Sequence, residues 1–319
     1  MLITPRPEPV PDDESRPSIG WEEAGCPLCA SRHWSPLIEA QDPQAGVDGL
    51  WFAVVQCDAC GTCFTNPRPD AASIGRFYPK NYAPHERHIR PRSASFWRGL
   101  KNLWSPPRVE MRPVAWHGEG RLLDFGCGNG AYLKLMADRG WKVTGLDFSS
   151  RAVEQIREQL GLTAYLGTLP HIDLEHESFD VITMWHSLEH VHEPMSLLRE
   201  SRKLLVPGGK IVIAVPNIDS WPFRWFGRHW FGLDVPRHLT HFTPTSLTQM
   251  LQRAGFATAP LEFARYSYWI RESARRYCSH HIQAPWTSRA MRNRYLSRIA
   301  SWWCWLHEQS DCIVATGRR

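Results

Sequence analysis

The sequence predicts an α/β protein built on a doubly wound, mostly parallel sheet, preceded by a small cysteine-bearing module. From residue 121 onward, short apolar runs alternate with helical patterns, as is typical of strands joined by crossover helices. Before residue 70, two CxxC pairs stand in a segment without that alternation. The expected parts are a disordered lead-in (1–20), the cysteine module (21–69), a helical connector (70–110) and the α/β domain (111–319).

The first elements of the α/β region follow one another closely. "RLLDF" (121–125) and "KVTGLD" (142–147) are apolar runs of strand length. "GAYLKLMADRG" (130–140) between them has helical spacing and ends in glycine, a common helix stop. "LTAYL" (162–166) and "FDVITM" (179–184) are the next two expected strands.

The second half continues the alternation. "MSLLRESRKLL" (195–205) predicts a helix, and "KIVIAVP" (210–216) predicts a buried strand. "TPTSLTQMLQRAGF" (243–256) predicts a helix with Thr243 as N-cap, a proline in its first turn and Gly255 beyond its end. Two later candidate strands, near "LEFARYSY" (261–268) and "DCIVATG" (311–317), would extend the sheet.

Composition limits the classes of protein that are compatible with the chain. The 319 residues are 43% hydrophobic and 22% charged, which is ordinary for a protein with a sizeable core. The sequence contains no apolar run long enough for a transmembrane helix. Its first residues lack the pattern of a signal peptide, so we expect a cytoplasmic location. The net charge of +5 is too mild to indicate a nucleic-acid partner.

Nine cysteines in a chain with no export signal suggest metal binding rather than disulfides. Cys26 and Cys29 form one CxxC pair, Cys57 and Cys60 form another, and 27 residues separate them. Four thiolates complete a tetrahedral zinc shell with no position left for water, so the predicted zinc is structural. The alternative is two unrelated pairs of buried or redox-active thiols. Cys63 could replace one ligand, although a half-buried spectator role is favoured.

The stretch "LLDFGCGNG" (122–130) predicts a nucleotide-binding turn. A strand runs into Gly126, Gly128 and Gly130, where a bare backbone can approach a ligand closely, and a helix N-terminus follows. The next strand ends in Asp147, placed to accept hydrogen bonds from ribose hydroxyls. Asp124 beside the turn would repel a phosphate-bearing cofactor, whereas the cationic end of S-adenosylmethionine tolerates a carboxylate. The sequence therefore favours S-adenosylmethionine over a nicotinamide dinucleotide.

Together with that turn, "VTGLDFS", "SFDVITMWHSLEHVHEP" and "LLVPGGKIVIAVPN" resemble the ordered motifs of class I S-adenosylmethionine-dependent methyltransferases. The segment "FGRHWFGLDVPRHLTHFTPTSLTQMLQRAGF" is similar to a bacterial subgroup with a PRHL–HFTP signature. The paired CxxC motifs resemble sugar C-methyltransferases with an N-terminal zinc module. The resemblance covers roughly residues 25–70 and 115–257. It implies a doubly wound, Rossmann-like, seven-stranded methyltransferase sheet with a small zinc-ribbon module.

The resemblance also assigns cofactor-binding residues. Those around the methionine portion would be Asp124, Gly126, Gly128 and Gly130. Asp147 would hold the ribose and Phe148 the adenine face. Gly167, Thr168 and Leu169 would border the adenine, and Trp185 and His186 would stand where cofactor and acceptor meet. For Phe148 and Leu169, a place in the core is an equal alternative.

A hydroxyl or carbon acceptor must lose a proton, and histidine suits the task of general base. His238 and His241 are the preferred candidates because they follow the fifth strand, over the expected acceptor pocket. His186 is a third candidate, and His190 is interpreted as structural. No dedicated magnesium site for a catechol stands out.

Two segments bear on the acceptor. Residues 220–238 mix tryptophan, phenylalanine and arginine, as in a lid over a sugar-bearing or apolar substrate. Residues 264–305 carry eight arginines, one acid and five tryptophans, which suits peripheral contact with an anionic membrane at its inner face. The favoured alternative is a helical hairpin that packs its tryptophans on the sheet. Phosphates of a sugar-nucleotide would also explain the arginines.

The function expected from these patterns is methylation at oxygen or carbon of a small molecule. A sugar or a cell-surface glycan intermediate, sugar-nucleotide or lipid-linked, is the expected acceptor. An RNA methyltransferase is one alternative, although only two basic residues, Arg32 and Arg68, stand between 21 and 69. A non-catalytic zinc-ribbon adaptor is another, although its site would have no physical reason to retain the glycine turn and both aspartates.

Overall fold

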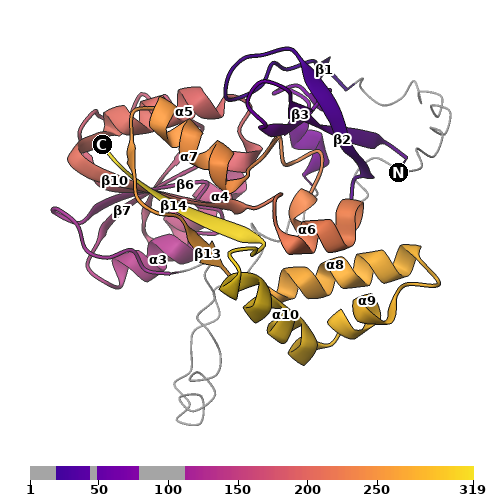
Figure 1. The fold of residues 1–319 in the computed structure, drawn as a ribbon. Helices are drawn as coiled ribbons and strands as arrows, with labels where there is room; N and C mark the ends of the chain where they lie inside the picture. The colour runs from indigo at the N-terminus through magenta and orange to yellow at the C-terminus, as the bar shows by residue number, and fades with distance from the viewer. Residues whose placement is uncertain (1–18, 44–48, 79–111) are drawn as a thin grey trace, which may run out of the picture.

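The computed structural model describes residues 19–43, 49–78 and 112–319 (Figure 1). Nearly all of the expected lead-in (1–20) and most of the expected connector (70–110) lie outside the described residues. The part of the connector that is described contains the short 3-10 helix η1 (Ile74–Phe77).

A mostly parallel sheet organises the α/β region. Its strand order is β8–β7–β6–β9–β10–β14–β12, and β13 also pairs with β14. The strands β6 to β10 are parallel where they pair, and β14 is antiparallel to β10. The bounds are β6 Arg121–Phe125, β7 Lys142–Asp147, β8 Thr163–Leu166, β9 Phe179–Trp185, β10 Leu205–Pro216, β12 Ala257–Thr258, β13 Glu262–Ala264 and β14 Cys312–Arg318.

The Rossmann-like sheet predicted from the sequence is confirmed, but it has eight strands rather than seven. The difference arises beside β14, where two short strands, β12 and β13, occupy the position expected for one. The strand expected over 261–268 ends at Ala264, because helix α8 begins at Ser267.

Helices cover both faces of the sheet. Helices α5 (Pro194–Leu204) and α7 (Pro244–Arg253) lie on one face, and α3 (Ala131–Ala137) lies on the other (Figure 1). Successive side chains of β6 point to opposite faces of the sheet, as strand geometry requires. Leu123 belongs to the core cluster that contains the apolar residues of α5 and α7, and Leu122 belongs to the cluster that contains those of α3.

The helix α7 forms as its sequence predicts. The Thr243 hydroxyl accepts the Ser246 N–H, and the Ser246 hydroxyl accepts the Thr243 N–H, which makes a reciprocal capping box. Beyond the helix, Gly255 has a φ of +90°. Helix α4 (Ser150–Gln155), which continues as a π-helical turn (Ile156–Leu160), was not expected as a separate element.

The N-terminal residues form two small sheets. Strands β1 (Trp21–Glu22) and β5 (Arg68–Pro69) pair with each other. Strands β2 (Trp34–Gln41), β3 (Trp51–Cys57) and β4 (Cys63–Thr65) form a second sheet, which β11 (Thr240–His241) completes at its edge. The strand β11 comes from the α/β region, so the cysteine module shares its sheet with the domain that follows.

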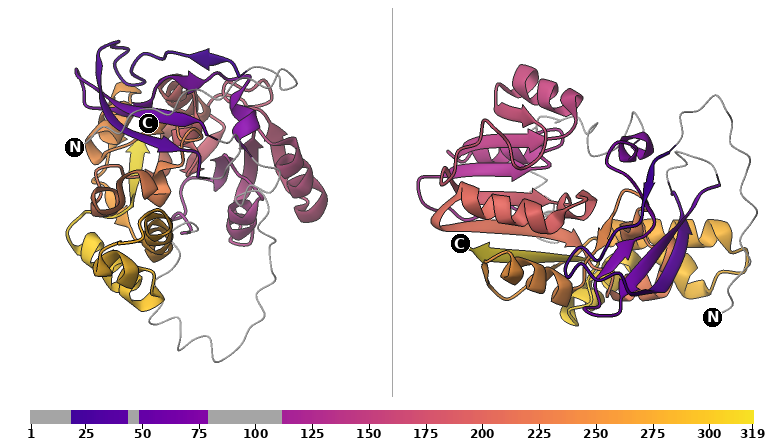
Figure 2. Two further views of the ribbon diagram at one scale, coloured as in Figure 1. Left: turned by 90° about the vertical axis from the view of Figure 1, so that its right-hand side faces the viewer. Right: turned by 90° about the horizontal axis from the view of Figure 1, so that it is seen from above.

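Three helices, α8 (Ser267–His280), α9 (Trp286–Met291) and α10 (Arg294–Leu306), stand between β13 and β14. The helix α8 and the N-terminal strands lie on the same side of the molecule (Figure 2). The segment is helical, as expected, but the alternative that its tryptophans pack on the sheet is wrong for four of the five. Trp269 is buried, whereas the others are exposed: Trp286, Trp302, Trp303 and Trp305. No described helix is both long and apolar enough to cross a membrane.

Candidate active site

The turn after β6 has the conformation that its glycines suggest. Gly126, Gly128 and Gly130 have φ angles of +72°, +51° and +74°, a region that other residues seldom adopt. A Cβ atom on Gly126 would stand 2.5 Å from Cβ of Ser187, and one on Gly130 would stand 2.7 Å from Cγ1 of Ile156. Neither position therefore accepts a side chain without rearrangement, and the backbone of the turn stays bare.

Asp147 ends β7 and joins this turn to the next helix. Its Oδ2 accepts a hydrogen bond from the Gly128 N–H at 2.8 Å, and its Oδ1 accepts one from the Ser149 N–H at 2.9 Å. An ionised carboxylate has about four acceptor positions, so further bonds to ligand hydroxyls remain available. The predicted role of Asp147 as the ribose ligand is compatible with this geometry.

Asp124 lies under the turn and is 2% exposed. The Thr183 hydroxyl donates a hydrogen bond to its Oδ1 at 2.7 Å. Burial raises the pKa of Asp124 to about 7, although the Thr183 hydrogen bond opposes the rise. A cationic ligand nearby would favour the ionised carboxylate, whereas an anionic ligand would meet repulsion.

The other residues predicted to bind the cofactor differ in their exposure to solvent. Phe148 is 56% exposed and contacts the Tyr78 ring edge-on with centroids 5.3 Å apart, so it is not part of the core. Thr168 is exposed and Gly167 is partly exposed. Leu169, by contrast, is buried within the main core cluster, which fits the alternative that it packs in the core. Trp185 is half-buried and its ring lies 5.3 Å from that of Tyr132.

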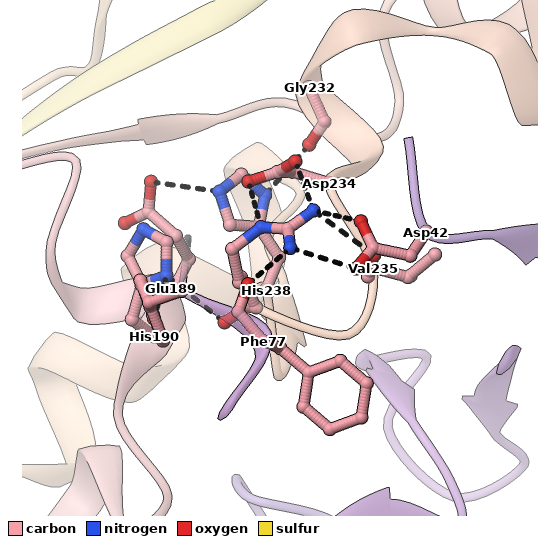
Figure 3. A network of polar contacts seen from close by, with 10 residues as sticks. Asp42, Phe77, Glu189, His190, Gly232, Asp234, Val235 and His238 are labelled. Atoms are coloured by element: carbon pink, nitrogen blue, oxygen red, sulfur yellow. Dashed lines mark hydrogen bonds and ion pairs between the residues drawn. The ribbon is translucent and has the colours of Figure 1, made fainter. Parts of the chain in front are cut away.

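A cluster of one glutamate and three histidines lies beyond the carboxyl end of β9. Figure 3 shows Glu189, His190 and His238 of this cluster. Glu189 is 1% exposed, and neither carboxylate oxygen has a hydrogen-bond partner among the described residues. Its Oε1 lies 3.5 Å from Nδ1 of His186 and 4.0 Å from Nε2 of His238. His190 stands against His238 with ring centroids 4.7 Å apart.

His186 adopts a φ of +53°, which is rare for a residue with a side chain. Such conformations persist where the surrounding structure enforces them, and they concentrate at functional sites. Burial alone would lower the pKa of His186, but Cys312 and Glu189 together hold it well above the ordinary value. The Glu189 carboxylate, 3.5 Å from Nδ1, is one of the groups that favour the protonated form of His186.

The pKa values of the other three histidines are shifted in the opposite direction. Burial lowers the pKa of His190 and of His238 to about 4, and it lowers that of His241 to about 3. These three side chains are neutral near pH 7. His241 also points into the N-terminal sheet, where its Nε2 lies 3.0 Å from the Thr65 hydroxyl. A general base works best when its pKa is near the working pH, so this arrangement favours neither His238 nor His241 as a strong base.

The four cysteines of the two CxxC pairs come together, as predicted. Sγ of Cys26 lies 3.4 Å from that of Cys60, Sγ of Cys29 lies 3.6 Å from that of Cys57, and all four lie within 4.8 Å of one another. Zinc–sulfur bonds of about 2.3 Å in a tetrahedron place sulfurs roughly 3.8 Å apart, so the residues fit zinc. Cys63 is not in the group, and burial raises its pKa to about 12.

The fold and the bare glycine turn between two buried aspartates define a class I S-adenosylmethionine-dependent methyltransferase. The chain belongs to the family described as "Methyltransferase domain", whose model matches residues 88–261. The adaptor alternative is therefore not supported.

Several known proteins are similar to this chain. A ubiquinone biosynthesis O-methyltransferase of Vibrio cholerae is 32% identical over 202 residues, which cover 57% of this chain and 82% of that protein. Another ubiquinone biosynthesis O-methyltransferase, of Idiomarina loihiensis, is 27% identical over 198 residues, which cover 53% of this chain and 81% of that protein. A solved S-adenosylmethionine-dependent methyltransferase of Mesorhizobium loti is 20% identical, with a TM-score of 0.43 over 71% of this chain and 99% of that one. The names of these relatives give no support to a sugar or glycan acceptor.

Sequence reasoning missed two participants in the site. No role is predicted for Glu189 in the sequence analysis, yet it is the buried centre of the histidine cluster. Tyr78 was assigned to the connector, yet its hydroxyl lies 3.0 Å from Nδ1 of His190. A glutamate between buried positions was the available signal for the first, because an unpaired buried carboxylate is rare. No local signal marked the second.

Proposed function

We propose that this protein transfers the methyl group of S-adenosylmethionine to a hydroxyl oxygen of a small aromatic acceptor. The observation that carries the proposal is the nearness of the glycine turn to the polar cluster. The Ser187 hydroxyl donates a hydrogen bond to the Phe125 carbonyl at 2.9 Å, which ties the segment 186–190 to the end of β6. Acceptor and methyl donor would meet between these two segments. Relatives named ubiquinone biosynthesis O-methyltransferases support oxygen as the methylated atom.

The residues of this chain contribute mainly by positioning. S-adenosylmethionine supplies a methyl group on a cationic sulfur. A lone pair of the acceptor oxygen can attack this methyl carbon, and the sulfur is the leaving group. Backbone atoms of Gly126 and Gly128 would lie against the methionine portion, and Asp147 would accept ribose hydroxyls. The exposed ring of Phe148 would stack on the adenine. Holding two reactants in line can remove a large part of the barrier, because their relative motion is already restricted.

The acceptor would carry an apolar tail or ring, and the surface of α9 and α10 favours its delivery from a membrane. Large apolar side chains are exposed over these helices and the connection before α9: Ile282, Trp286, Tyr295, Leu296, Ile299, Trp302, Trp303, Trp305 and Leu306. Arginines lie among them, and Arg265 stacks 3.6 Å from the centroid of the Trp302 ring. Within 264–305 only Glu272 opposes eight arginines. Exposed tryptophan with excess positive charge suits the interface of an anionic bilayer.

We also propose that the four-cysteine cluster holds a structural zinc ion. All four ligands would be thiolates, so no coordination position would remain for a substrate. The protein would act in the cytoplasm at the inner face of the membrane, with no specific nucleic-acid partner.

The experiment that tests the proposal measures cofactor binding and methyl transfer separately. Calorimetric titration of the zinc-loaded protein with S-adenosylmethionine, S-adenosylhomocysteine and NAD is expected to show binding of the two sulfur compounds alone. Asp147→Ala should abolish this binding, whereas Asp138→Ala, which removes an exposed carboxylate paired with Lys134, should not.

Transfer of labelled methyl groups is then compared between polyprenylated dihydroxybenzenes and sugar-nucleotides. Labelled phenolic ethers are the expected product. Methylated sugar-nucleotides would overturn the aromatic acceptor and restore the glycan interpretation, and binding of NAD alone would overturn the proposed reaction.

A further inference from the structure

We propose that a basic cluster at the end of α8 binds the phosphate groups of a ligand, at a site separate from the methyl-transfer site. Its members come from the 3-10 helix η5 (Gly227–His229), from α8 and from the residue after α8: Arg228, His229, Arg276, His280 and His281. The cluster lies where the chain leaves α8 toward α9 (Figure 1). The inference does not depend on the proposed methyl transfer.

The three histidine rings of the basic cluster pack against one another. The His229 ring stacks on that of His280 with centroids 4.7 Å apart, and it meets the His281 ring edge-on at 5.2 Å. The Tyr277 ring is stacked on His281 at 4.2 Å. Two segments that are distant in the chain therefore bring three imidazoles to one place.

The histidines have ring nitrogens available to a ligand. Nδ1 of His280 lies 2.8 Å from the Arg276 carbonyl oxygen, and Nδ1 of His281 lies 2.9 Å from the Tyr277 carbonyl oxygen. A carbonyl oxygen only accepts, so each Nδ1 carries a proton and each Nε2 is left for a ligand. Such an imidazole donates to an anion through Nε2 only after it gains a second proton, so anion binding should be stronger at lower pH.

Two guanidinium groups border the histidines, and neither makes a hydrogen bond or ion pair with another described residue. Arg276 is half-buried over the Phe231 ring, 4.7 Å from its centroid, and Arg228 lies over the Trp51 ring at 5.2 Å. A guanidinium presents five N–H donors in a planar fork that matches phosphate oxygens. The aromatic faces orient both arginines and leave these donors unused.

The residues of the cluster do not balance its positive charge. The pKa of His229 is lowered to about 4, first by burial and then by repulsion from the other four members. Two carboxylates, Asp234 and Glu272, attract Arg276, but each already pairs with another arginine. A bound anion would therefore relieve repulsion that the protein leaves uncompensated.

The other elements packed near η5 do not supply that anion. Strand β2 has one charged residue, Glu39, and its neighbour Ile38 points toward η5. Successive side chains of a strand point to opposite faces, so Glu39 points away from the cluster. Strand β3 has no charged residue, and the one in α6 (Trp221–Phe226), Arg224, pairs with Asp219 at 2.7 Å.

The arrangement suits phosphate rather than a metal ion. The three histidines do not form one of the described groups in which metal-ligating atoms lie within 4.8 Å of one another, and two guanidinium groups would repel a cation. Phosphate oxygens accept several charge-assisted hydrogen bonds at once. A soluble phosphate compound and a lipid headgroup share this chemistry, and the exposed side chains of Ile282 and Trp286 follow the cluster in the chain.

Calorimetric titration of the full-length, zinc-loaded protein with inorganic pyrophosphate tests the site. The wild-type protein should bind one pyrophosphate, more tightly at pH 6 than at pH 8, and saturating S-adenosylhomocysteine should not change the affinity. Arg276→Gln should weaken binding at least tenfold. Arg275→Gln is the matched control on the same helix, because Arg275 is exposed and pairs with Glu272 at 3.2 Å, and it should leave the affinity unchanged. His280→Gln combined with His281→Gln should remove the difference between the two pH values.

Sedimentation with vesicles distinguishes the two sources of phosphate. Preference for phosphatidic acid over phosphatidylcholine vesicles, reduced at least tenfold in Arg276→Gln but not in Arg275→Gln, would identify a lipid headgroup as a ligand. Binding of pyrophosphate alone would identify a soluble compound. Thermal unfolding of each variant confirms that it is folded. Binding of neither probe, equal losses in the two arginine variants, or displacement of pyrophosphate by S-adenosylhomocysteine would overturn the site.

Discussion

Arg237 is expected to be the most costly single charge to remove from this protein. Its guanidinium is fully buried and is held by Asp42 at 2.6 and 3.1 Å, Asp234 at 2.9 and 3.0 Å, and the Phe77 carbonyl at 2.7 Å. Burial would raise the pKa of Asp234, but Arg237 holds it far below its usual range. Arg237→Met keeps much of the volume and removes the guanidinium that bonds to two buried carboxylates.

Removing one partner of a buried ion pair costs about 3–5 kcal/mol, and the loss of bonds to two buried carboxylates places this variant at the upper end. The free energy of unfolding is measured by urea titration at pH 7.5 on zinc-loaded protein. Arg224→Met is the matched control: its partner Asp219 lies at 2.7 Å, but both side chains are more than half exposed, so a loss of at most about 1 kcal/mol is expected.

Asp42→Asn added to Arg237→Met should recover part of the loss, because it removes one of the two buried negative charges that faced the guanidinium. Equal losses in Arg237→Met and Arg224→Met, or no recovery in the double variant, would refute the reasoning from burial.

Three further outcomes are expected. Because Asp124 keeps its proton in the ligand-free folded state up to about pH 7 and loses it near pH 4 when unfolded, it makes stability fall between pH 4 and 7. Asp124→Asn should therefore reduce the fall in the free energy of unfolding between pH 4 and 7 by up to about 4 kcal/mol, as measured by urea titrations. The same pH dependence in the variant and the wild-type protein would contradict the raised pKa of Asp124. Cys57→Ser should lower both the amount of zinc released by a mercurial thiol reagent and the Tm. Cys278→Ser, outside the cluster, should change neither. An unchanged zinc content in Cys57→Ser would show that these thiols are not the zinc ligands. Trp286→Ala combined with Trp303→Ala should reduce sedimentation with phosphatidylglycerol vesicles at least tenfold. Ile172→Ala, which removes a more exposed apolar side chain outside α9 and α10, should not. Equal sedimentation of all three proteins would exclude α9 and α10 as the lipid-binding surface.

The sequence predicted those parts of the fold whose signals are local. Strand periodicity located β6 to β10, and the cap at Thr243 located the start of α7. The glycine turn was predictable because bare residues between a strand and a helix have few other uses. The exposure of the tryptophans of α9 and α10 was harder to predict. Their spacing does not show whether they pack against the protein itself or against another molecule.

The polar cluster could not be predicted, because it depends on contacts between distant residues. Glu189 and His238 meet only after β9 and the segment following β10 are packed together, and Tyr78 reaches His190 from the N-terminal part. Local patterns favoured a structural role for His190. They carried no information on whether the carboxylate of Glu189 would find a hydrogen-bond donor.

The strand β11 has a consequence for how the chain is made. It completes the N-terminal sheet by pairing Thr240 with Phe64 and His241 with Cys63, and the Thr65–His241 contact spans 176 residues. At a synthesis rate of about 5–20 residues per second, the growing N-terminal segment waits roughly 10–35 s for its last strand. During this interval the edge of β4 is open to other chains on the same polysome, and early capture of a metal by the four thiols would restrain the segment until its partner leaves the ribosome.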